Sequence, residues 1–555
     1  MSTTLPTEIP TEISAEISVE ISAPAEAGIP ADNIGLAVMT TLRNYGIDTI
    51  FGIPGTHNLE FYRHLAPLGI HPVTSRHEQG AGYGADGWSQ LTGLPGVVIT
   101  TSGPGLLNAM SAAATAYCES RPLIILSPGA PRGSEFSDIG SLHETRDPTG
   151  AVRALIGRST RVSSGAEAVE LIHEAFDLFA HGRPRPVHIE IPLDLLESAN
   201  DVDPSLCAAR GLGPARNADA GALAAAVSVL ARAANPVILA GGGSLRAGSA
   251  LLELAELLQA PVVTTLNGKG AIPESHPLSL GSDIRLSAAQ DLCNGADALL
   301  VIGSKVGESE LWGGAIVPQG SCIRIDIDPG QLAVNLSADI ELAGNAAAVV
   351  PALLAGLAGH IAAAQADVSV LKAQLQDEAR EMSPVLARIN EILAGVLPAD
   401  TVIGGDSSQV TYFGTASFFP MDSAHQLLYT PCYATLGYGL PASIGAKVAA
   451  PDRPVVCLLG DGALMFAVQE FITAVEQGVD LPIICVNNGG YGEIKANMAD
   501  RGIAPVGVDL AQPDWVKLAE GFGLAAFAVD NLDELGTTVT KAMAVRGPSL
   551  IHVAI

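Results

Sequence analysis

Residues 455–494 read VVCLLGDGALMFAVQEFITAVEQGVDLPIICVNNGGYGEI, and this stretch carries the strongest signal for the fold. The apolar run Val455–Leu459 ends in Gly-Asp-Gly, and a second apolar run, Leu481–Val486, ends in Asn-Asn-Gly-Gly. The residues between them, Leu464–Gln477, have the composition of a helix. Short apolar runs that flank a helix are typical of parallel strands in an α/β sheet. The sequence therefore predicts a strand–helix–strand unit with polar residues at the carboxyl ends of its strands, where such sheets bind ligands.

The polar residues at these strand ends are suited to a metal ion and a diphosphate. Asp461, Asn488 and the backbone carbonyl of Gly490 supply the hard oxygen ligands that Mg²⁺ prefers, and water and phosphate oxygens would complete its octahedron. The glycines allow the backbone to approach a diphosphate at the N-terminus of a helix. The motif therefore predicts a joint site for Mg²⁺ and a diphosphate.

The bulk properties limit the class of protein. The chain has 555 residues, more than one hydrophobic core accommodates, so we expect several domains. The net charge of −29 argues against nucleic acid or an anionic membrane as a partner. The seven cysteines include no Cys-x-x-Cys pair, which favours reduced thiols in a cytoplasmic protein over a disulfide framework or a zinc site. No apolar run reaches membrane-spanning length, and the first residues lack the features of a signal peptide.

The chain divides by composition into a tail and three segments of similar size. Residues 1–31 form an acidic, low-complexity stretch that we expect to be disordered. Apolar runs such as GVVITTSGPG, PVILAGGG and VVCLLGDG then alternate with helical stretches over residues 32–200, 221–365 and 383–555. This alternation predicts three doubly wound α/β domains with parallel sheets.

Five segments, in order along the chain, carry a family resemblance. They are FGIPGTHN, SRHEQGAGYGADGW, TTSGPGLLNAM, YATLGYGLPASIGAK and GDGA followed by NNGGYGE. On these segments, residues 33–555 resemble the thiamine-diphosphate enzymes of the acetohydroxyacid synthase, benzoylformate decarboxylase and pyruvate decarboxylase superfamily. The resemblance implies a pyrimidine-binding domain, a central domain and a diphosphate-binding domain, with thiamine diphosphate and Mg²⁺ as cofactors.

The resemblance assigns the central chemical role to Glu78. It implies that the Glu78 carboxyl hydrogen-bonds the pyrimidine ring of the cofactor and favours the imino tautomer, whose nitrogen removes the thiazolium C2 proton. An apolar surrounding would raise the pKa of the carboxyl, as proton sharing requires.

Other residues match segments that hold the cofactor in the resembling family. Asp461, Asn488 and the Gly490 carbonyl are the implied Mg²⁺ ligands. Leu436 is the implied apolar wedge that bends the cofactor, so that base and C2 meet. The remaining implied cofactor contacts are Ser407, Ser408, Gln409, Ala434, Gly462, Ala463, Tyr491 and Gly492.

The loop after the first strand offers acid–base candidates. Thr56 and His57 stand where related enzymes place a polar side chain above the thiazolium, and a histidine can shuttle protons near neutral pH. Asn108, His143 and Glu144 are further candidates for contact with the substrate.

Departures from the family patterns narrow the reaction. The segment SGPGLLNAM lacks the paired histidines of pyruvate decarboxylases, and GGYGEIKANM has Glu493 where acetohydroxyacid synthases have an apolar residue. A buried acid is costly unless it meets a cation, and a guanidinium fits a carboxylate well. Together with a similarity to 2-ketoarginine decarboxylases, this predicts decarboxylation of a 2-oxo acid with a cationic or polar tail, such as 5-guanidino-2-oxopentanoate.

Two alternatives stay open. One is carboligation from pyruvate, as in acetolactate synthases, and the other is a catalytically silent paralogue that binds the cofactor. The intact Glu78, Asp461 and Asn488 argue against the silent paralogue.

The resemblance also bears on the central domain and on assembly. Central domains of the family sometimes bind FAD, but the run LAGGGS is read here as a tight turn rather than a nucleotide site. The resemblance implies a homodimer or homotetramer with active sites between chains.

Overall fold

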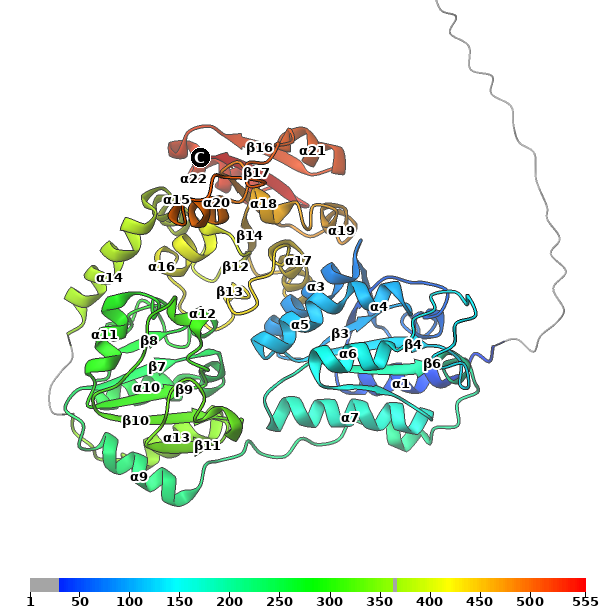
Figure 1. The fold of residues 1–555 in the computed structure, drawn as a ribbon, viewed down its shortest axis with the longest axis horizontal. Helices are drawn as coiled ribbons and strands as arrows, with labels where there is room; N and C mark the ends of the chain where they lie inside the picture. Colours follow the sequence, from blue (N-terminus) through cyan, green and yellow to red (C-terminus); the bar gives the residue numbers. More distant parts are fainter. Residues whose placement is uncertain (1–28, 363–366) are drawn as a thin grey trace, which may run out of the picture.

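Three parallel β-sheets, each covered by helices, follow one another along the chain (Figure 1). The computed structural model describes residues 29–362 and 367–555. The disordered tail expected over residues 1–31 lies, up to residue 28, outside the described residues. All pairings between the named strands are parallel, which confirms the expected α/β class with three doubly wound sheets.

The first sheet has six strands in the order β2-β1-β3-β4-β6-β5, and its core lies on both faces. Its strands are β1 Thr49–Gly52, β2 His71–Thr74, β3 Gly96–Ile99, β4 Leu123–Gly129, β5 Ser159–Arg161 and β6 Val187–Pro192. Its helices are α1 Ile34–Asn44, α2 Leu59–Tyr62, α3 Glu78–Thr92, α4 Pro104–Asn108, α5 Met110–Glu119, α6 Pro148–Ile156, α7 Gly165–His181 and α8 Leu193–Leu196.

The second sheet has five strands in the order β11-β10-β9-β7-β8. Its strands are β7 Pro236–Ala240, β8 Val262–Thr264, β9 Ala298–Ile302, β10 Ser321–Asp326 and β11 Ile340–Ala343. Its helices are α9 Ala220–Leu230, α10 Ser249–Leu258, α11 Ser287–Gly295, α12 Glu308–Leu311 and α13 Ala346–Gly356.

The third sheet has six strands in the order β13-β12-β14-β15-β17-β16. Its strands are β12 Val402–Gly405, β13 Leu427–Leu428, β14 Val455–Gly460, β15 Pro482–Asn487, β16 Ala525–Val529 and β17 Ser549–Ala554. Its helices are α15 Pro384–Val396, the π-helix η5 Val410–Thr415, α16 Ala416–Phe418, α17 Gly439–Ala449, α18 Asp461–Leu464, α19 Glu470–Glu476, α20 Gly492–Asp500, α21 Trp515–Phe522 and α22 Leu535–Met543. The preceding helix, α14 Ser369–Met382, buries Leu375 and Ala379 in a core of the second sheet.

The helix expected over Leu464–Gln477 is divided into α18 and α19, so this prediction was wrong in detail. Between them, the N–H groups of Phe466 and Ala467 bond to carbonyls three residues earlier, which tightens the chain into turns. These turns bring Phe466 against Gly437 in the segment before α17.

The first and third domains pack through α3 and α17, which lie side by side in Figure 1. A side chain at Gly445 would overlap the carbonyl oxygen of Gly84, and one at Gly87 would overlap that of Ala442. Glycine at these positions allows the two helix backbones to touch. The contact fixes the N-terminus of α3, and with it Glu78, relative to the third sheet.

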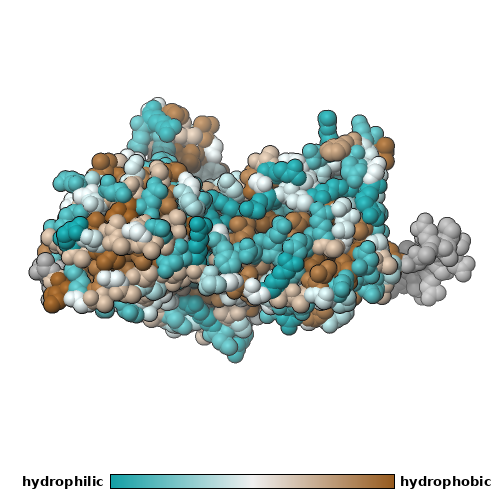
Figure 2. Space-filling model, turned by 90° about the horizontal axis from the view of Figure 1, so that it is seen from below, coloured by the Kyte–Doolittle hydropathy of each residue, from teal (hydrophilic) through white to brown (hydrophobic). Residues whose placement is uncertain are grey.

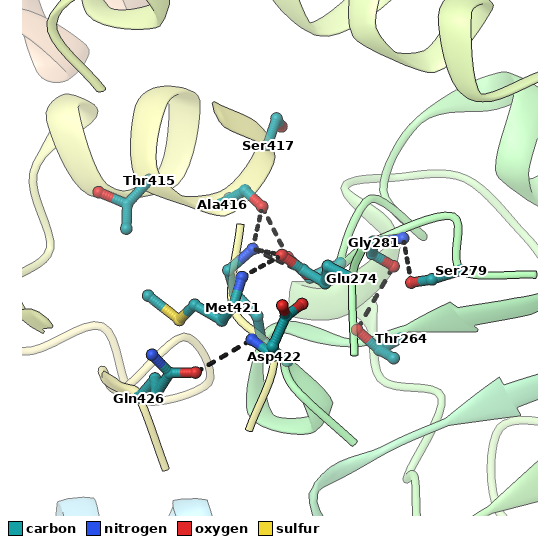
Figure 3. Close-up of polar contacts among 12 residues, drawn as sticks. Thr264, Glu274, Ser279, Gly281, Thr415, Ala416, Ser417, Met421, Asp422 and Gln426 are labelled. Atoms are coloured by element: carbon teal, nitrogen blue, oxygen red, sulfur yellow. Dashed lines mark hydrogen bonds and ion pairs between the residues drawn. The ribbon is translucent and has the colours of Figure 1, made fainter. Parts of the chain in front are cut away.

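A buried ion pair of the second domain, Lys269–Glu274, is hydrogen-bonded to the third domain, and Figure 3 shows the contacts of Glu274. Lys269 Nζ donates to both carboxylate oxygens of Glu274, at 2.8 and 2.7 Å, and to the Ala416 carbonyl at 2.9 Å. Met421 N donates to Glu274 Oε2 at 2.9 Å. Because every charge here has a partner, the pair can be buried without a large penalty.

The surface mixes residue types. In Figure 2, hydrophobic residues lie interspersed among hydrophilic ones over the face shown. Within residues 29–362 and 367–555, no helix has the length and apolar character needed to cross a bilayer.

Candidate active site

Three neighbouring strands of the third sheet are followed by polar residues at their carboxyl ends. Strand β14 leads into Asp461, the first residue of α18, and β15 leads into Asn488. Strand β12 leads into Ser407, Ser408 and Gln409. Since β14 pairs with both β12 and β15 in parallel, these residues gather at the carboxyl end of the sheet, as expected for a ligand site.

Asp461, Asn488 and Gly490 form a cluster of oxygen atoms. The Asn488 side-chain amide lies 3.2 Å from Asp461 Oδ1 and 3.0 Å from the Gly490 carbonyl oxygen, and its Nδ2 donates to both. With this amide turned over, its oxygen would join the Asp461 carboxylate and the Gly490 carbonyl as one of three neighbouring oxygen ligands. The donor set therefore fits Mg²⁺.

The surroundings of Asp461 hold its carboxylate in place. Asp461 is buried, and burial raises the pKa of its carboxyl. Gln512 Nε2 donates to Asp461 Oδ2 at 2.8 Å, and the Asn488 N–H donates to Oδ1 at 3.3 Å. The sequence motif did not indicate Gln512, because it lies outside the Gly-Asp-Gly segment and an isolated glutamine carries no signal.

The loop after β12 faces the same cluster. Ser408 Oγ accepts from the Gly460 N–H at 2.9 Å, so Ser408 ties this loop to the end of β14. Ser407 Oγ is buried and has no hydrogen-bond partner in the described part of the chain. A buried hydroxyl of this kind is available to a ligand such as a diphosphate oxygen.

Asp406 shapes the segment that carries Ala434 and Leu436. Its carboxylate accepts from the N–H groups of Gly437 and Gly439 at 3.1 and 2.7 Å, and burial raises its pKa to about 6. Ala434 is exposed in a left-handed conformation with φ 53°, and Leu436 is half-buried. Sequence reasoning missed Asp406, although it directly follows a strand.

Glu78 lies at the first turn of α3 and is buried. Asn108 Nδ2 donates to Glu78 Oε2 at 2.9 Å, which brings together two of the predicted residues. Burial and the Glu78 charge raise the pKa of Tyr62, whose buried hydroxyl has no partner among the described residues. Glu78 is therefore buried beside polar side chains of the first domain.

His57 and His143 lie near Glu78, since His143 packs against Gly103 and Glu78 against Gly105 of the same segment. We call Glu78, Asn108, His57 and His143 the Glu78 cluster. His57 Nδ1 lies 2.6 Å from Ser102 Oγ, and the two imidazole rings meet edge to face at 5.3 Å. Burial and the neighbouring His143 lower the pKa of His57. His143 has a left-handed backbone with φ 60° and a buried Nδ1 without a partner among the described residues, which is typical of a functional position.

Two further residues predicted for the site, Thr56 and Glu144, are exposed. Thr56 is exposed, beside His57. Glu144 is exposed, and its Oε2 accepts from the N–H groups of Ile139 and Ser141 and from Ser141 Oγ, at 3.0–3.1 Å. In this arrangement Glu144 stabilises its own loop.

Glu493 lies near Gln409 and aromatic side chains. Its Oε2 accepts from Gln409 Nε2 at 3.1 Å and from the Tyr412 hydroxyl at 3.4 Å, and Oε1 accepts from Asn497 Nδ2 at 3.4 Å. These partners, all those it has in the described residues, are neutral. Tyr412 packs edge to face with Phe413 and with Trp312, the latter a half-exposed residue of the second domain with φ 50°.

The Glu78 cluster and the Asp461 cluster belong to different sheets. No hydrogen bond or ion pair among residues 29–362 and 367–555 joins them. Apolar side chains next to each cluster are exposed, namely Leu107 beside Asn108, and Met465 and Phe466 beyond Asp461.

The three consecutive glycines of the LAGGGS segment, residues 241–243, lie in the second domain. A side chain at Gly241 would overlap the carbonyl oxygen of Gly303, so the run allows the chain ends of β7 and β9 to pack closely.

Comparison with known families agrees with this geometry. Three family models match: the N-terminal TPP binding domain of thiamine pyrophosphate enzymes over residues 32–149, the central domain over 223–353, and the C-terminal TPP binding domain over 409–553. The chain belongs to the thiamine pyrophosphate enzymes, and it is an enzyme of the decarboxylase or carboligase type.

Individual relatives represent both reaction types. The chain is 38% identical to the "Probable 2-ketoarginine decarboxylase AruI" of Pseudomonas aeruginosa, covering 94% of this chain and 93% of the relative. It is 31% identical to the "Probable acetolactate synthase large subunit" of Methanocaldococcus jannaschii, with 94% and 91% covered. It is 30% identical to the acetolactate synthase isozyme 3 large subunit of Escherichia coli K12, with 93% of each chain covered.

Proposed function

We propose that this enzyme decarboxylates, without oxidation, a 2-oxo acid with a cationic tail, such as 5-guanidino-2-oxopentanoate, to an aldehyde and CO₂. The observation that carries this proposal is the carboxylate of Glu493, whose partners are neutral and which lies beside Tyr412. An acid so placed is stabilised by a substrate cation. The similarity to a relative named for 2-ketoarginine supports the same substrate class.

The Tyr412 ring beside Glu493 adds to the proposed recognition of the tail, while the neighbouring Trp312 ring carries the Arg285 guanidinium at 4.9 Å. Trp312 and Tyr412 have ring centroids 5.8 Å apart, and Tyr412 lies on the π-helix η5, a rare element that is frequent at functional sites. A guanidinium stacks on aromatic faces and pairs with a carboxylate in the same plane. Pyruvate has no group that would use either contact.

We propose that Asp461, Asn488 and the Gly490 carbonyl hold Mg²⁺, and that Ser407 and the N–H groups at Gly462 and Ala463 hold the diphosphate. Thiamine diphosphate, when bound, supplies the carbon nucleophile and the electron sink that decarboxylation needs. Leu436, Ala434, Tyr491 and Gly492 are the proposed further contacts to it.

The residues of the first domain have the proposed proton roles. Glu78 holds a proton against the cofactor ring, and Asn108 fixes the orientation of its carboxyl. His57, oriented by Ser102, delivers the proton that replaces the lost carboxylate. Thr56 and His143 lie beside His57 and are proposed to contact the substrate.

We infer that the complete site needs two chains. The absence of bonds between the two clusters in the described residues supports this inference, as do the exposed Leu107 and Phe466 beside them. In a homodimer, or a tetramer built from two, Glu78 of one copy would serve the Asp461 cluster of the other.

The test compares Glu493→Gln with wild type on 5-guanidino-2-oxopentanoate and pyruvate. Losing the charge should raise the KM for the guanidino acid by about 10–100-fold, the effect of a charge-assisted hydrogen bond, and leave pyruvate turnover nearly unchanged. Asp500→Asn, an exposed acid on the same helix α20, is the matched control and should behave as wild type. Equal effects of Glu493→Gln on both substrates would refute the substrate assignment.

Carboligation is the second candidate function, because the acetolactate synthase relatives cover nearly the whole chain. Carboligation requires that the carbon atom that loses CO₂ forms its new bond to a second carbonyl compound instead of to a proton. Acetolactate as the main product from pyruvate would favour this candidate.

A further inference from the structure

Cys118 and Cys432 lie close together where the three domains meet. Cys118 belongs to the last turn of α5 in the first domain, and Cys432 lies between β13 and α17 in the third. Their sulfur atoms lie within 4.8 Å of each other and of a carboxylate oxygen of Glu119. Both cysteines are half-buried, whereas the other five are buried.

Glu119 fixes the position of Cys432 relative to Cys118. Its Oε1 accepts from the N–H groups of Cys432 and Tyr433, both at 2.8 Å, and its Oε2 accepts from Asn267 Nδ2 at 2.8 Å. The carboxylate is therefore engaged by the backbone of the third domain and by a side chain of the second. Because these hydrogen bonds occupy its oxygen atoms, Glu119 positions the neighbouring segments of the three domains and is not a free metal ligand.

The surroundings of the two sulfurs are unequal. The neighbouring Cys118, aided by Ser309 and Lys305, lowers the pKa of the Cys432 thiol, whereas the neighbouring Cys432 and burial raise the pKa of Cys118. Ser309 Oγ lies 3.4 Å from Cys432 Sγ, and Lys305 Nζ donates to the Cys118 carbonyl at 2.7 Å. A thiol with a lowered pKa beside a thiol with a raised pKa is the arrangement of an attacking and a resolving cysteine.

We propose that Cys118 and Cys432 form a reversible disulfide when the protein meets a peroxide. The Cys432 thiolate attacks hydrogen peroxide, breaks its O–O bond and becomes a sulfenic acid, while hydroxide leaves and takes the Cys118 proton to form water. Cys118 then attacks the Cys432 sulfur, the S–S bond forms, and the sulfenic oxygen leaves as hydroxide. Two electrons pass from the sulfurs to the peroxide, whose oxygens end as water and hydroxide.

This disulfide would join the first and third domains covalently. Cys432 lies in the segment that continues through Ala434 and Leu436 to α17. We expect the oxidised protein to exchange thiamine diphosphate more slowly, and this consequence alone rests on the proposed cofactor site.

The test uses the full chain and hydrogen peroxide. After treatment, free thiols should fall from seven to five, and peptide mapping by mass spectrometry should find Cys118 linked to Cys432, with the link removed by dithiothreitol. Cys118→Ser and Cys432→Ser should each abolish the link, whereas the control Cys207→Ser should retain it.

Other products would overturn the proposal. A link between other cysteines, or a further-oxidised Cys432 without any link to Cys118, would do so. Zinc bound by the pair in place of peroxide-dependent linkage would also do so. If a serine variant does not fold, the map of the wild-type protein still decides. Since the readout is a covalent bond, it is independent of the substrate and of catalytic activity.

Discussion

Gln512 illustrates how a single side chain outside the motif orients the proposed metal site. It donates to Asp461 Oδ2 at 2.8 Å, and its own Oε1 accepts from Trp515 Nε1 at 3.1 Å, which fixes its amide. Gln512→Leu should lower the affinity for Mg²⁺ by about 10–100-fold, as loss of a partner to a metal ligand does, in a folded protein. Calorimetric titration of Mg²⁺ in the presence of thiamine diphosphate measures this affinity.

The comparison variant is Asp461→Asn, which removes the ligand itself and should abolish Mg²⁺-dependent cofactor binding. Wild-type affinity in Gln512→Leu would show that the Asp461 carboxylate needs no such support.

At the residue scale, the sequence predicts what is local and misses what is not. Asp461 and Asn488 end adjacent parallel strands, so the pattern alone indicates that they meet. Gln512 joins them from 51 positions away, and Trp312 reaches Tyr412 from another domain. Neither contact produces a pattern of periodicity or composition in the sequence from which it could be predicted.

At the scale of elements, the backbones of α3 and α17 touch at glycine positions, where there is no room for a side chain. Gly445→Ala would place a methyl group on the Gly84 carbonyl, and we expect it to destabilise the protein by about 1–3 kcal/mol through overpacking. The thermal unfolding midpoint should fall accordingly.

Gly395→Ala is the matched control, since an added methyl there, near the end of α15, meets no neighbour within 4 Å. Because alanine favours helix, this variant should be as stable as wild type or more stable by up to about 1 kcal/mol. Equal midpoints for Gly445→Ala and wild type would mean that the helices can move apart without cost.

Strand β6 carries a buried histidine that makes stability depend on pH. His188 lies between Ser127 Oγ at 2.8 Å and Ser159 Oγ at 2.7 Å, and burial lowers its pKa from 6.5 to about 3. Below pH 6.5 the unfolded chain binds a proton that the folded chain excludes. The contribution of His188 is therefore complete above pH 6.5 and is lost toward pH 3, by about 1.4 kcal/mol per pH unit.

His188→Gln lacks this titration, so its free energy of unfolding should fall less steeply than that of wild type between pH 6.5 and 4. Chemical unfolding at a series of pH values measures the difference. Parallel curves for the two proteins would mean that His188 is protonated in the folded state.

Several central strands were predicted from the sequence, whereas three short or alanine-rich edge strands were not. Buried runs such as Val455–Leu459 and Leu481–Val486 form β14 and β15 in the middle of the third sheet. The edge strands β5, β13 and β16 were not predicted, because β5 and β13 are three and two residues long and β16 is largely alanine. The helix after Asp461 was predicted as one element, since its division depends on contact with Gly437.

At the scale of the whole molecule, the proposal of a site shared between two chains predicts complementation. Glu78→Gln and Asp461→Asn should each be inactive alone, because each damages every site. Co-expressed in equal amounts, they should recover about a quarter of wild-type activity, since half of the dimers are mixed and each mixed dimer has one intact site. Activity that stays at the level of the single variants would mean that Glu78 and Asp461 of the same chain act together.

The most direct test of the central claim is a product analysis of the wild-type enzyme with Mg²⁺, thiamine diphosphate, and either 5-guanidino-2-oxopentanoate or pyruvate. CO₂ and aldehyde should be measured together. We predict a higher kcat/KM for the guanidino acid, with one aldehyde formed for each CO₂ released. Faster turnover of pyruvate, with acetolactate as the product, would contradict the account.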